Sequence, residues 1–449
     1  MALGGGTWLF QNKVLPGAYI NFQSKVRPTV DFADRGYGAM PLELDWGPEG
    51  QIFTVEAADF QKESLRYFGY DYTSDKIKGL RDLFKNLQTG YFYRINNAAV
   101  KASCDFATAK YGGVRGNDLT IVIAENIDDE SKYEVTTYLN VDGSKVIVDK
   151  QIVSGKDDLE DNDYVEFKRD KFAVTAGAPL TGGSNGEKIT GTQYQEFLDK
   201  IEPYYFNTLG CVSTDSTIQD LFIQFTKRMR DDVGVKFQTI VYGKENVDYE
   251  GVISIQNKVI DDGENPASLV YWLTGAEASC AVNASCTNKT YDGDFTVDVN
   301  YKQSELEKAV LSGMMIFHRV TDPVAGDVTG DVNILRDINT FTSFSKSKNK
   351  DFSSNQVIRV LDQIAIDIAR LFNRQYDGKE PNDQDGRVAL WGDIVAYNKE
   401  LQRVRAIQNF VSEDVPIPQQ GDSKESVLSN YQVQPTVCME KLYMNIVVA

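Results

Sequence analysis

The side chains best suited to catalysis are few and scattered along the chain. The single histidine, His318, lies in the apolar stretch 314–320 without a constellation of cysteines or carboxylates around it. A general base has to lie within hydrogen-bonding reach of the proton that it moves, and a third group usually orients it. We therefore interpret His318 as a structural residue.

The metal-binding and phosphate-binding motifs are incomplete. Cys280 and Cys286 have a C-x5-C spacing without a second pair of ligands, which disfavours zinc. The acidic run 157–163 lacks the glycine and the glutamate that a calcium loop carries at its sixth and twelfth positions, so we interpret it as a solvated loop. The glycine-rich stretch 182–188 does not have the spacing of a phosphate loop and predicts a turn. The sequence predicts neither a metal nor a cofactor.

Composition and charge narrow the class of protein. With 449 residues and 42% hydrophobic content, the chain is long enough for about two to four globular domains. Its 65 acidic and 47 basic residues give a net charge of −18, which repels nucleic acid and anionic membranes alike. The first residues lack the basic and apolar regions of an export signal, and no apolar run is long enough to span a membrane. Five scattered cysteines favour reduced thiols and synthesis in a reducing cytoplasm.

Hydrophobic periodicity predicts an α/β chain with an all-β insertion. Helices and strands alternate before about residue 96 and again after residue 187, which favours βαβ units and a partly parallel sheet. Between them, short strands are separated by Asp, Gly and Asn. The expected strands are 37–56 with a break at 45–48, 90–95, 119–124, 133–141, 145–152, 207–213, 236–242 and 252–256, and the expected helices are 59–68, 76–87, 192–201 and 218–231.

The C-terminal region predicts two amphipathic helices. A Ser-x-x-Gln capping box at Ser353–Gln356 opens the first helix, which is expected to end near Gln375. The second is expected over residues 388–410, and a solvated face is the default for its charged side, with a polar partner as the alternative. Its apolar stripe contains Trp391, Ile394, Leu401, Val404 and Ile407.

Both ends of the chain alternate like half-buried strands. Near the N-terminus Ala18, Ile20 and Phe22 share one face, and at the C-terminus every second residue from 442 to 448 is apolar. The pattern alone favours pairing of the two ends within one subunit, and strand addition to another chain is the alternative.

The expected fold class is therefore α/β (α+β) and multidomain. A mixed-sheet core carries an inserted all-β domain, an α+β C-terminal domain, and extended N- and C-terminal strand arms. The expected divisions are an N-terminal arm 1–26, an α/β core domain 27–96 plus 187–345, a β-rich outer domain 97–186, a C-terminal domain 346–433 and a C-terminal arm strand 434–449.

Several segments resemble, in order and in spacing, the motifs of contractile phage tail sheath proteins. The likeness is greatest to the sheaths of defective prophages and of phage-tail-like, R-type bacteriocins from Gram-positive bacteria. It covers almost the whole chain, although 119–175 carries no such motif, which suits a variable insertion. The matching segments are 45–48, 111–118, 180–183, 275–278 with 283–287, 337–344, 355–362, 378–387 and 434–443.

The resemblance implies a mechanical role without catalysis. Sheath subunits stack as hexameric rings around an inner tube and contract when the baseplate triggers, which drives the tube through a bacterial envelope. The implied partners are other copies of this chain, the tube protein, and baseplate and tail terminator proteins, with no nucleic acid and no membrane. Assembly is expected in the bacterial cytoplasm, followed by release as part of a phage tail or bacteriocin particle.

In sheath proteins the terminal arms reach neighbouring subunits and complete a sheet in their C-terminal domains, which reverses the preference for pairing within one subunit. The charge cluster on the second C-terminal helix suggests a contact with the tube through Lys399, Arg403 and Arg405. An α/β enzyme such as a carbohydrate hydrolase, for which the many carboxylates leave room, and a non-contractile adhesin-like module are the alternatives. The resemblance assigns intersubunit contacts to Tyr19, Ile20, Phe22, Leu442, Tyr443, Met444, Ile446 and Val448.

Overall fold

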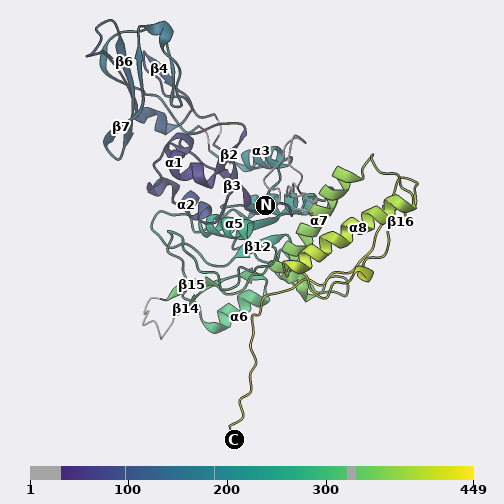
Figure 1. The fold of residues 1–449 in the computed structure, drawn as a ribbon. Coiled ribbons are helices and arrows are strands. Elements are labelled where there is room, and N and C mark those ends of the chain that lie inside the picture. The colour runs from purple at the N-terminus through teal and green to yellow at the C-terminus, as the bar shows by residue number, and fades with distance from the viewer. Residues whose placement is uncertain (1–31, 97, 187, 321–329, 449) are drawn as a thin grey trace, which may run out of the picture.

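The computed structural model describes residues 32–96, 98–186, 188–320 and 330–448 (Figure 1). A central α/β body carries a β-rich unit at one end and a pair of long helices at the other. The C-terminal tail leaves the body as an extended segment without secondary structure. No helix within these ranges is both long and apolar enough to cross a bilayer.

The central body is built on a seven-stranded sheet with the order β13-β12-β11-β10-β1-β3-β2. All neighbours in this sheet are parallel except β2, which pairs antiparallel with β3. Parallel strands are buried on both faces because crossover helices cover them, which explains why almost every residue of β1, β10, β11 and β12 is buried. The strands are β1 (Tyr37–Leu42), β2 (Ile52–Glu56), β3 (Thr89–Arg94), β10 (Thr208–Gly210), β11 (Gln238–Tyr242), β12 (Val252–Ile255) and β13 (Met314–Met315).

Helices cover both faces of this sheet and form two apolar cores. On one face, α1 (Ala57–Phe68), α2 (Lys78–Phe84) and α5 (Leu269–Ser279) bury side chains against β1, β3 and β12. On the other face, α3 (Gly191–Ile201) and α4 (Ser216–Lys227) do the same. The predicted alternation of helices and strands, and with it the mixed α/β fold class, is confirmed.

The β-rich unit contains a four-stranded antiparallel sheet and a separate two-stranded one. Alternate residues of its strands, such as Leu119, Ile121 and Ile123, point into one core. The strands expected at 119–124, 133–141 and 145–152 are present, whereas the domain limits 97–186 stay a prediction. The sheet order is β7-β6-β5-β9, with β4 paired to β8; the bounds are β4 (Ala107–Ala109), β5 (Leu119–Glu125), β6 (Tyr133–Val141), β7 (Ser144–Val153), β8 (Val165–Phe167) and β9 (Thr175–Pro179).

The break predicted at 45–48 is the junction between the body and the β-rich unit. Trp46 is buried in the core of the β-rich unit, where its ring stacks on Tyr164. The buried guanidinium of Arg94 donates to the carbonyl oxygens of Gly112 at 2.7 Å and Gly47 at 3.2 Å. These contacts tie the two units together.

The apolar stretch around His318 forms two strands rather than one. β13 joins the parallel sheet, whereas β14 (Phe317–Val320) turns away and pairs antiparallel with β15 (Asp331–Ile334). His318 lies on β14 and is partly buried, and burial lowers its pKa. Helix α6 (Gln303–Leu311) precedes β13.

The C-terminal domain consists of two long helices, α7 (Asn355–Gln375) and α8 (Gln384–Arg403), and a small hairpin of β16 (Gln419–Gln420) and β17 (Val427–Leu428). The predicted apolar stripe of the second helix contributes to the core of this domain, where Ile394, Leu401 and Ile407 are buried. Two details of the predicted helices are wrong: the capping box of the first and the end of the second.

The capping box does not form. Ser353 belongs to a 3-10 turn, and its hydroxyl donates to the Lys350 carbonyl at 2.8 Å. Ser354 is the residue that precedes α7, and its side chain makes no capping bond. The Gln356 side chain instead accepts a hydrogen bond from the backbone of Cys438 at 3.0 Å.

The second helix ends at Arg403 rather than at Phe410. Arg405 adopts a left-handed backbone with φ of 66°, which ends a helix. The Ala406 amide then donates to the Leu401 carbonyl at 2.9 Å, and the Gln402 side chain accepts from the Phe410 amide at 2.6 Å. The chain therefore folds back beside the helix end.

Two helical glycines give a matched test of this packing. A Cβ on Gly275 of α5 would lie 2.3 Å from the Leu83 carbonyl oxygen of α2, whereas a Cβ on Gly392 of α8 meets nothing within 4 Å. We expect Gly275→Ala to destabilise the fold by about 1–3 kcal/mol, because backbone cannot move aside cheaply. Gly392→Ala should stabilise it by about 0.5–1 kcal/mol. Thermal unfolding measures both, and equal shifts would contradict the close packing of α2 and α5.

Candidate functional site

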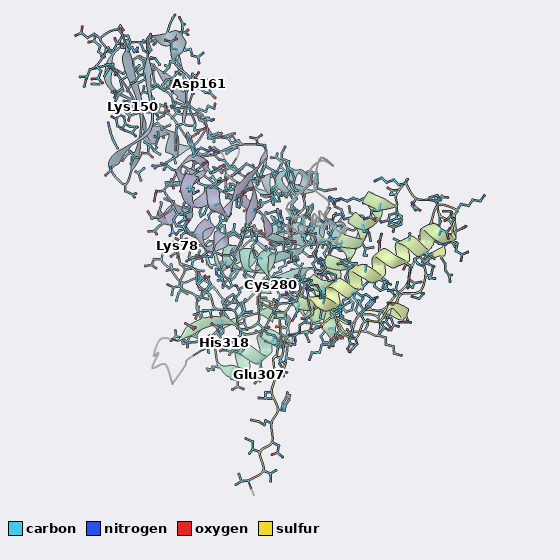
Figure 2. The ribbon with its side chains drawn as sticks, in the orientation of Figure 1. Lys78, Lys150, Asp161, Cys280, Glu307 and His318 are labelled. Carbon is cyan, nitrogen blue, oxygen red and sulfur yellow. The ribbon has the colours of Figure 1, made fainter. Side chains whose placement is uncertain are left out.

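The last residues of the described chain form an exposed apolar tail. Residues 441–448, here called the arm, pair with no strand within the described ranges, so the strand predicted there is absent from the single chain. The arm runs away from the body as an extended chain, with side chains on both sides of it (Figure 2). A strand without a partner leaves its backbone unpaired, and an exposed apolar segment marks a contact site. The exposed fractions run from 70% to 92% for Leu442, Tyr443, Met444, Ile446 and Val448.

In contrast to the arm, residues 434–440, here called the arm root, are tied to the body. The Gln434 carbonyl accepts from the Gln408 amide at 2.9 Å, and the Thr436 amide donates to the Ala406 carbonyl at 2.9 Å. The hydrogen bond from Cys438 to Gln356 then attaches the root to the first turn of α7.

Glu440 makes the last described contact before the arm leaves the body. Its carboxylate accepts from the Thr287 hydroxyl at 3.1 Å and forms an ion pair with Arg336 at 2.8 Å. The Thr287 hydroxyl in turn accepts from the Asp337 amide at 3.0 Å. Glu440 is therefore two hydrogen bonds away from the buried residue Asp337.

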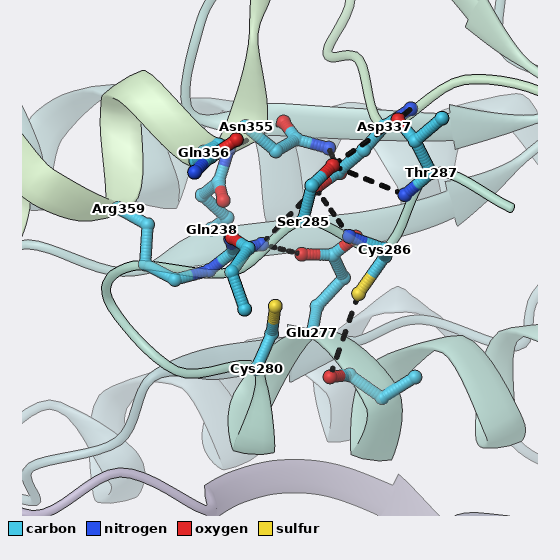
Figure 3. Close-up of polar contacts among 12 residues, drawn as sticks. Gln238, Glu277, Cys280, Ser285, Cys286, Thr287, Asp337, Asn355, Gln356 and Arg359 are labelled. Carbon is cyan, nitrogen blue, oxygen red and sulfur yellow. Dashed lines mark hydrogen bonds and ion pairs between the residues drawn. The ribbon is translucent and has the colours of Figure 1, made fainter. Parts of the chain in front are cut away.

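A cluster of buried ionisable side chains surrounds Asp337 (Figure 3), which Thr287 connects to Glu440 of the arm root. The Arg359 guanidinium from α7 contacts the carboxylate of Glu277 from α5 and lies 3.4 Å from that of Asp337, which follows β15. All three side chains are 1% exposed. Arg359 also donates to the Ala284 carbonyl at 2.8 Å, so it joins α5, α7 and the loop 283–287.

The two carboxyl groups of the cluster differ in environment. Asp337 accepts hydrogen bonds from Asn355 at 2.7 Å and from the Cys286 amide at 2.9 Å. Burial opposes ionisation of Asp337, but the charge of Arg359 and these hydrogen bonds lower its pKa. Burial and the charge of Asp337 raise the pKa of Glu277 well above its ordinary value, and the Oε1 atom of Glu277 has no hydrogen-bond partner among the described residues. Asp337 is thus the ionised member and Glu277 the titrating one.

The cluster also reaches the central sheet. The Gln238 side chain from β11 donates to Asn355 at 3.0 Å, and Asn355 donates to Asp337. A continuous set of side chains therefore runs from the parallel sheet through the start of α7 to the arm root.

By atom type, the cluster resembles a metal site. The ligand atoms of Glu277, Cys286 and Asp337 lie within 4.8 Å of one another. The Arg359 guanidinium lies against both carboxylates, however, and supplies the positive charge that they need. A cation there would add repulsion to Arg359, so we assign the cluster to structure.

Sequence reasoning missed this cluster because its members come from distant segments. Each lies within a segment on which the family resemblance rests: 275–278, 283–287, 337–344 and 355–362. The available signal was Glu277, a carboxylate within the otherwise apolar helix α5. A charged residue in such a helix needs a partner.

The remaining predicted site residues fall in two places. Tyr19, Ile20 and Phe22 lie outside the described residues. Lys399, Arg403 and Arg405 are exposed at the end of α8, and Arg403 already pairs with Glu400 on the same helix at 2.7 Å. Arg405 follows the helix end, so the three do not share one helical face.

The buried carboxyl groups give a paired prediction. Asp337→Asn should cost about 3–5 kcal/mol at neutral pH, because it removes a charge that Arg359 needs. Glu277→Gln should cost about 1 kcal/mol, because the amide replaces a carboxyl group that already favours its neutral form. Chemical or thermal unfolding of both variants measures the difference.

The pH profiles should differ in sign. The lowered pKa of Asp337 contributes stability above its ordinary value of 3.8, so the gap between wild type and Asp337→Asn should shrink as the pH falls below 3.8. The raised pKa of Glu277 contributes stability below pH 4.5, and this contribution is lost as the pH rises. The stability of Glu277→Gln relative to wild type should therefore increase with rising pH. Parallel profiles for the three proteins would contradict these assignments.

Four family models match consecutive parts of the chain. In chain order they describe the N-terminal region of domain III of tail sheath protein Gp18 (residues 35–98), the β-sandwich domain of phage tail sheath proteins (96–185), their central domain (187–340) and their C-terminal domain (347–449). The last match contains α7, α8, the arm root and the arm.

Individual proteins agree with the family models. The phage-like element PBSX protein XkdK of Bacillus subtilis (strain 168) is 30% identical over 480 residues, which cover 99% of each chain. The sheath tail protein of Desulfitobacterium hafniense has a crystal structure that matches with a TM-score of 0.78 at 37% identity, over 93% of this chain and 96% of that one. The contracted helical sheath of the anti-feeding prophage shares the fold, with a TM-score of 0.55 at 12% identity, over 97% of this chain and 99% of that one. The chain therefore belongs to the phage tail sheath protein family and is a structural subunit of a contractile tail sheath.

Proposed function

We propose that this subunit polymerises as stacked hexameric rings around an inner tube, and that the arm of each subunit forms a strand on a neighbouring one. The observation that carries this proposal is the contrast between the anchored arm root and the exposed arm. A segment whose direction is fixed by an anchored root, and whose backbone is unpaired, is suited to strand addition. Tyr19, Ile20 and Phe22 would supply the corresponding N-terminal contact.

The C-terminal domain offers a receiving surface. The β16–β17 hairpin has no further strand on either edge within the described residues. Beside it lies an apolar groove of about 480 Å³ between α7 and α8, whose lining includes Ile368, Leu390 and Val427. We propose that the apolar face of a neighbour's arm packs over this groove while its backbone extends the hairpin.

Each joint of this kind is of moderate strength. A backbone hydrogen bond contributes about 0.5–1.5 kcal/mol net, and burial of one large apolar side chain about 1.5–3 kcal/mol. Repeated over many subunits, such joints keep the lattice connected while the surfaces of the rigid domains exchange one set of contacts for another. Contraction is then a switch between two packings of the same subunits, triggered at the baseplate.

The other partners follow from the same role. The tube would lie inside the rings, and baseplate and tail terminator proteins would bind the two ends of the sheath. We propose assembly in the bacterial cytoplasm and release within a phage tail or bacteriocin particle. No catalytic step enters this scheme.

The alternation of the arm gives a matched pair of variants. Met444 and Asn445 are neighbours, and the side chain of Met444 is 70% exposed in the single chain. Met444→Asp should abolish tubes, because it places a charge on the face that packs against the neighbour. Asn445→Asp should leave them intact, and neither should change the unfolding temperature of the monomer. Negative-stain electron microscopy detects tubes, and normal tubes from Met444→Asp would show that the arm is not part of the interface.

Truncation separates the arm from its root. Deletion of residues 441–449 should leave a folded monomer with unchanged stability that does not polymerise. Deletion of residues 434–449 should also block polymerisation, but it removes the contacts of Cys438 and Glu440 and should lower the unfolding temperature. Tubes from either truncated chain would refute the assignment of the arm.

The contact with the tube rests on charge. Reversal of Lys399, Arg403 and Arg405 to Glu should prevent sheath from assembling on tube while self-assembly survives, because an acidic tube surface would then be repelled. Lys308→Glu, on the exposed face of α6, is the control and should change neither. Co-sedimentation with tube measures the loss of sheath binding, and full binding by the triple variant would refute the proposed contact.

A further inference from the structure

Cys280 and Cys286 form a pair of thiols that the sheath role does not use. Cys280 directly follows α5, and Cys286 lies in the loop 283–287. Their sulfur atoms lie near the space between the helix end and the loop (Figure 3), and the Cys286 thiol donates to the Ala276 carbonyl at 3.8 Å. Cys286 is buried, whereas Cys280 is partly exposed.

We propose that Cys280 and Cys286 are a redox-active dithiol, which a small-molecule disulfide oxidises to an intramolecular disulfide bond. Cys280 is the attacking thiol because it is the more exposed of the two and lies near two guanidinium groups. Arg359 lies in the same cluster, and Arg35 donates to the Cys280 carbonyl at 2.7 Å. A thiolate is the nucleophile in disulfide exchange, and nearby guanidinium groups stabilise it.

The protonation of the two thiols suits these roles. The hydrogen bond with Cys286, helped by the charges of Arg359 and Arg35, lowers the pKa of Cys280 to about 7. The same hydrogen bond, together with burial, raises the pKa of Cys286 well above its ordinary value. Among the other thiols, burial raises the pKa of Cys211 to about 12, which makes it inert.

The exchange proceeds in two balanced steps. The Cys280 thiolate attacks one sulfur of oxidised glutathione, which forms a mixed disulfide and releases one glutathione thiolate. That thiolate or solvent takes the proton of Cys286, whose sulfur then attacks the sulfur of Cys280 and expels the second glutathione. Two protein thiols are oxidised and one external disulfide is reduced to two thiols.

The position of the proposed Cys280–Cys286 disulfide gives it a structural consequence. It would close a short ring at the base of the loop that carries Thr287, and the Thr287 hydroxyl holds Glu440 of the arm root. Oxidation would therefore act on the loop that anchors the arm.

Peptide mapping of the whole chain tests the proposal. Trypsin cuts after Lys258 and Lys289, so both thiols fall in one peptide, 259–289. After incubation of the dispersed subunit with oxidised glutathione at pH 7, this peptide should lose the mass of two hydrogens. The exposed Cys438 should stop at the mixed disulfide and serves as the internal control for reagent access.

A Cys286→Ser variant tests the second step. Its peptide should retain one glutathione on Cys280, because the resolving thiol is gone. Two outcomes would overturn the proposal: a wild-type peptide that stays reduced while Cys438 is modified, or a wild-type peptide that keeps glutathione as Cys286→Ser does.

Discussion

The buried ion pair of Arg359 with Asp337, together with the contact of Arg359 with the carboxyl group of Glu277, is the constraint on which the rest of this subunit depends. All three side chains are almost completely buried, and a buried charge that loses its partner costs several kcal/mol. The end of α5, the start of α7 and the segment after β15 must therefore keep one arrangement. Such a cluster adds little net stability compared with apolar packing, because desolvation offsets the attraction. We infer that its contribution is to specify how α7 sits against α5 and the segment after β15.

The arm depends on that arrangement. Its root is held by Gln356, the second residue of α7, and by Thr287, which also accepts a hydrogen bond from the backbone amide of Asp337. Beyond Glu440 the described chain provides no strand for the apolar face of the arm. The contacts of the arm root therefore end where the proposed contact with a neighbour would begin, and a polymer joined in this way could change its packing while its connections persist. A sheath that contracts needs both properties.

Most of the fold was predictable because local patterns decide it. Strand β12 is rich in β-branched apolar residues, and α7 has apolar residues at helical spacing, so each was expected close to where it lies. The ends of elements were less predictable because tertiary contacts override local signals. Gln356 was expected to cap α7 and instead binds Cys438, and α8 was expected to reach Phe410 but ends before Arg405.

The candidate site was predictable only in part. The arm follows from its alternation, but its partner is not within the described chain, so no pattern in one subunit could reveal whether it pairs. The buried cluster depends on contacts between residues as far apart as Glu277 and Arg359, and the carboxylate of Glu277 in a mostly apolar helix shows that a partner is needed but not which residue it is. The measurement that tests the account most directly is amide hydrogen exchange of the same chain as monomer and as assembled tubes. Residues 434–440 should be protected in both states, and residues 442–448 should exchange freely in the monomer and become protected in tubes; free exchange of 442–448 in tubes would contradict the account.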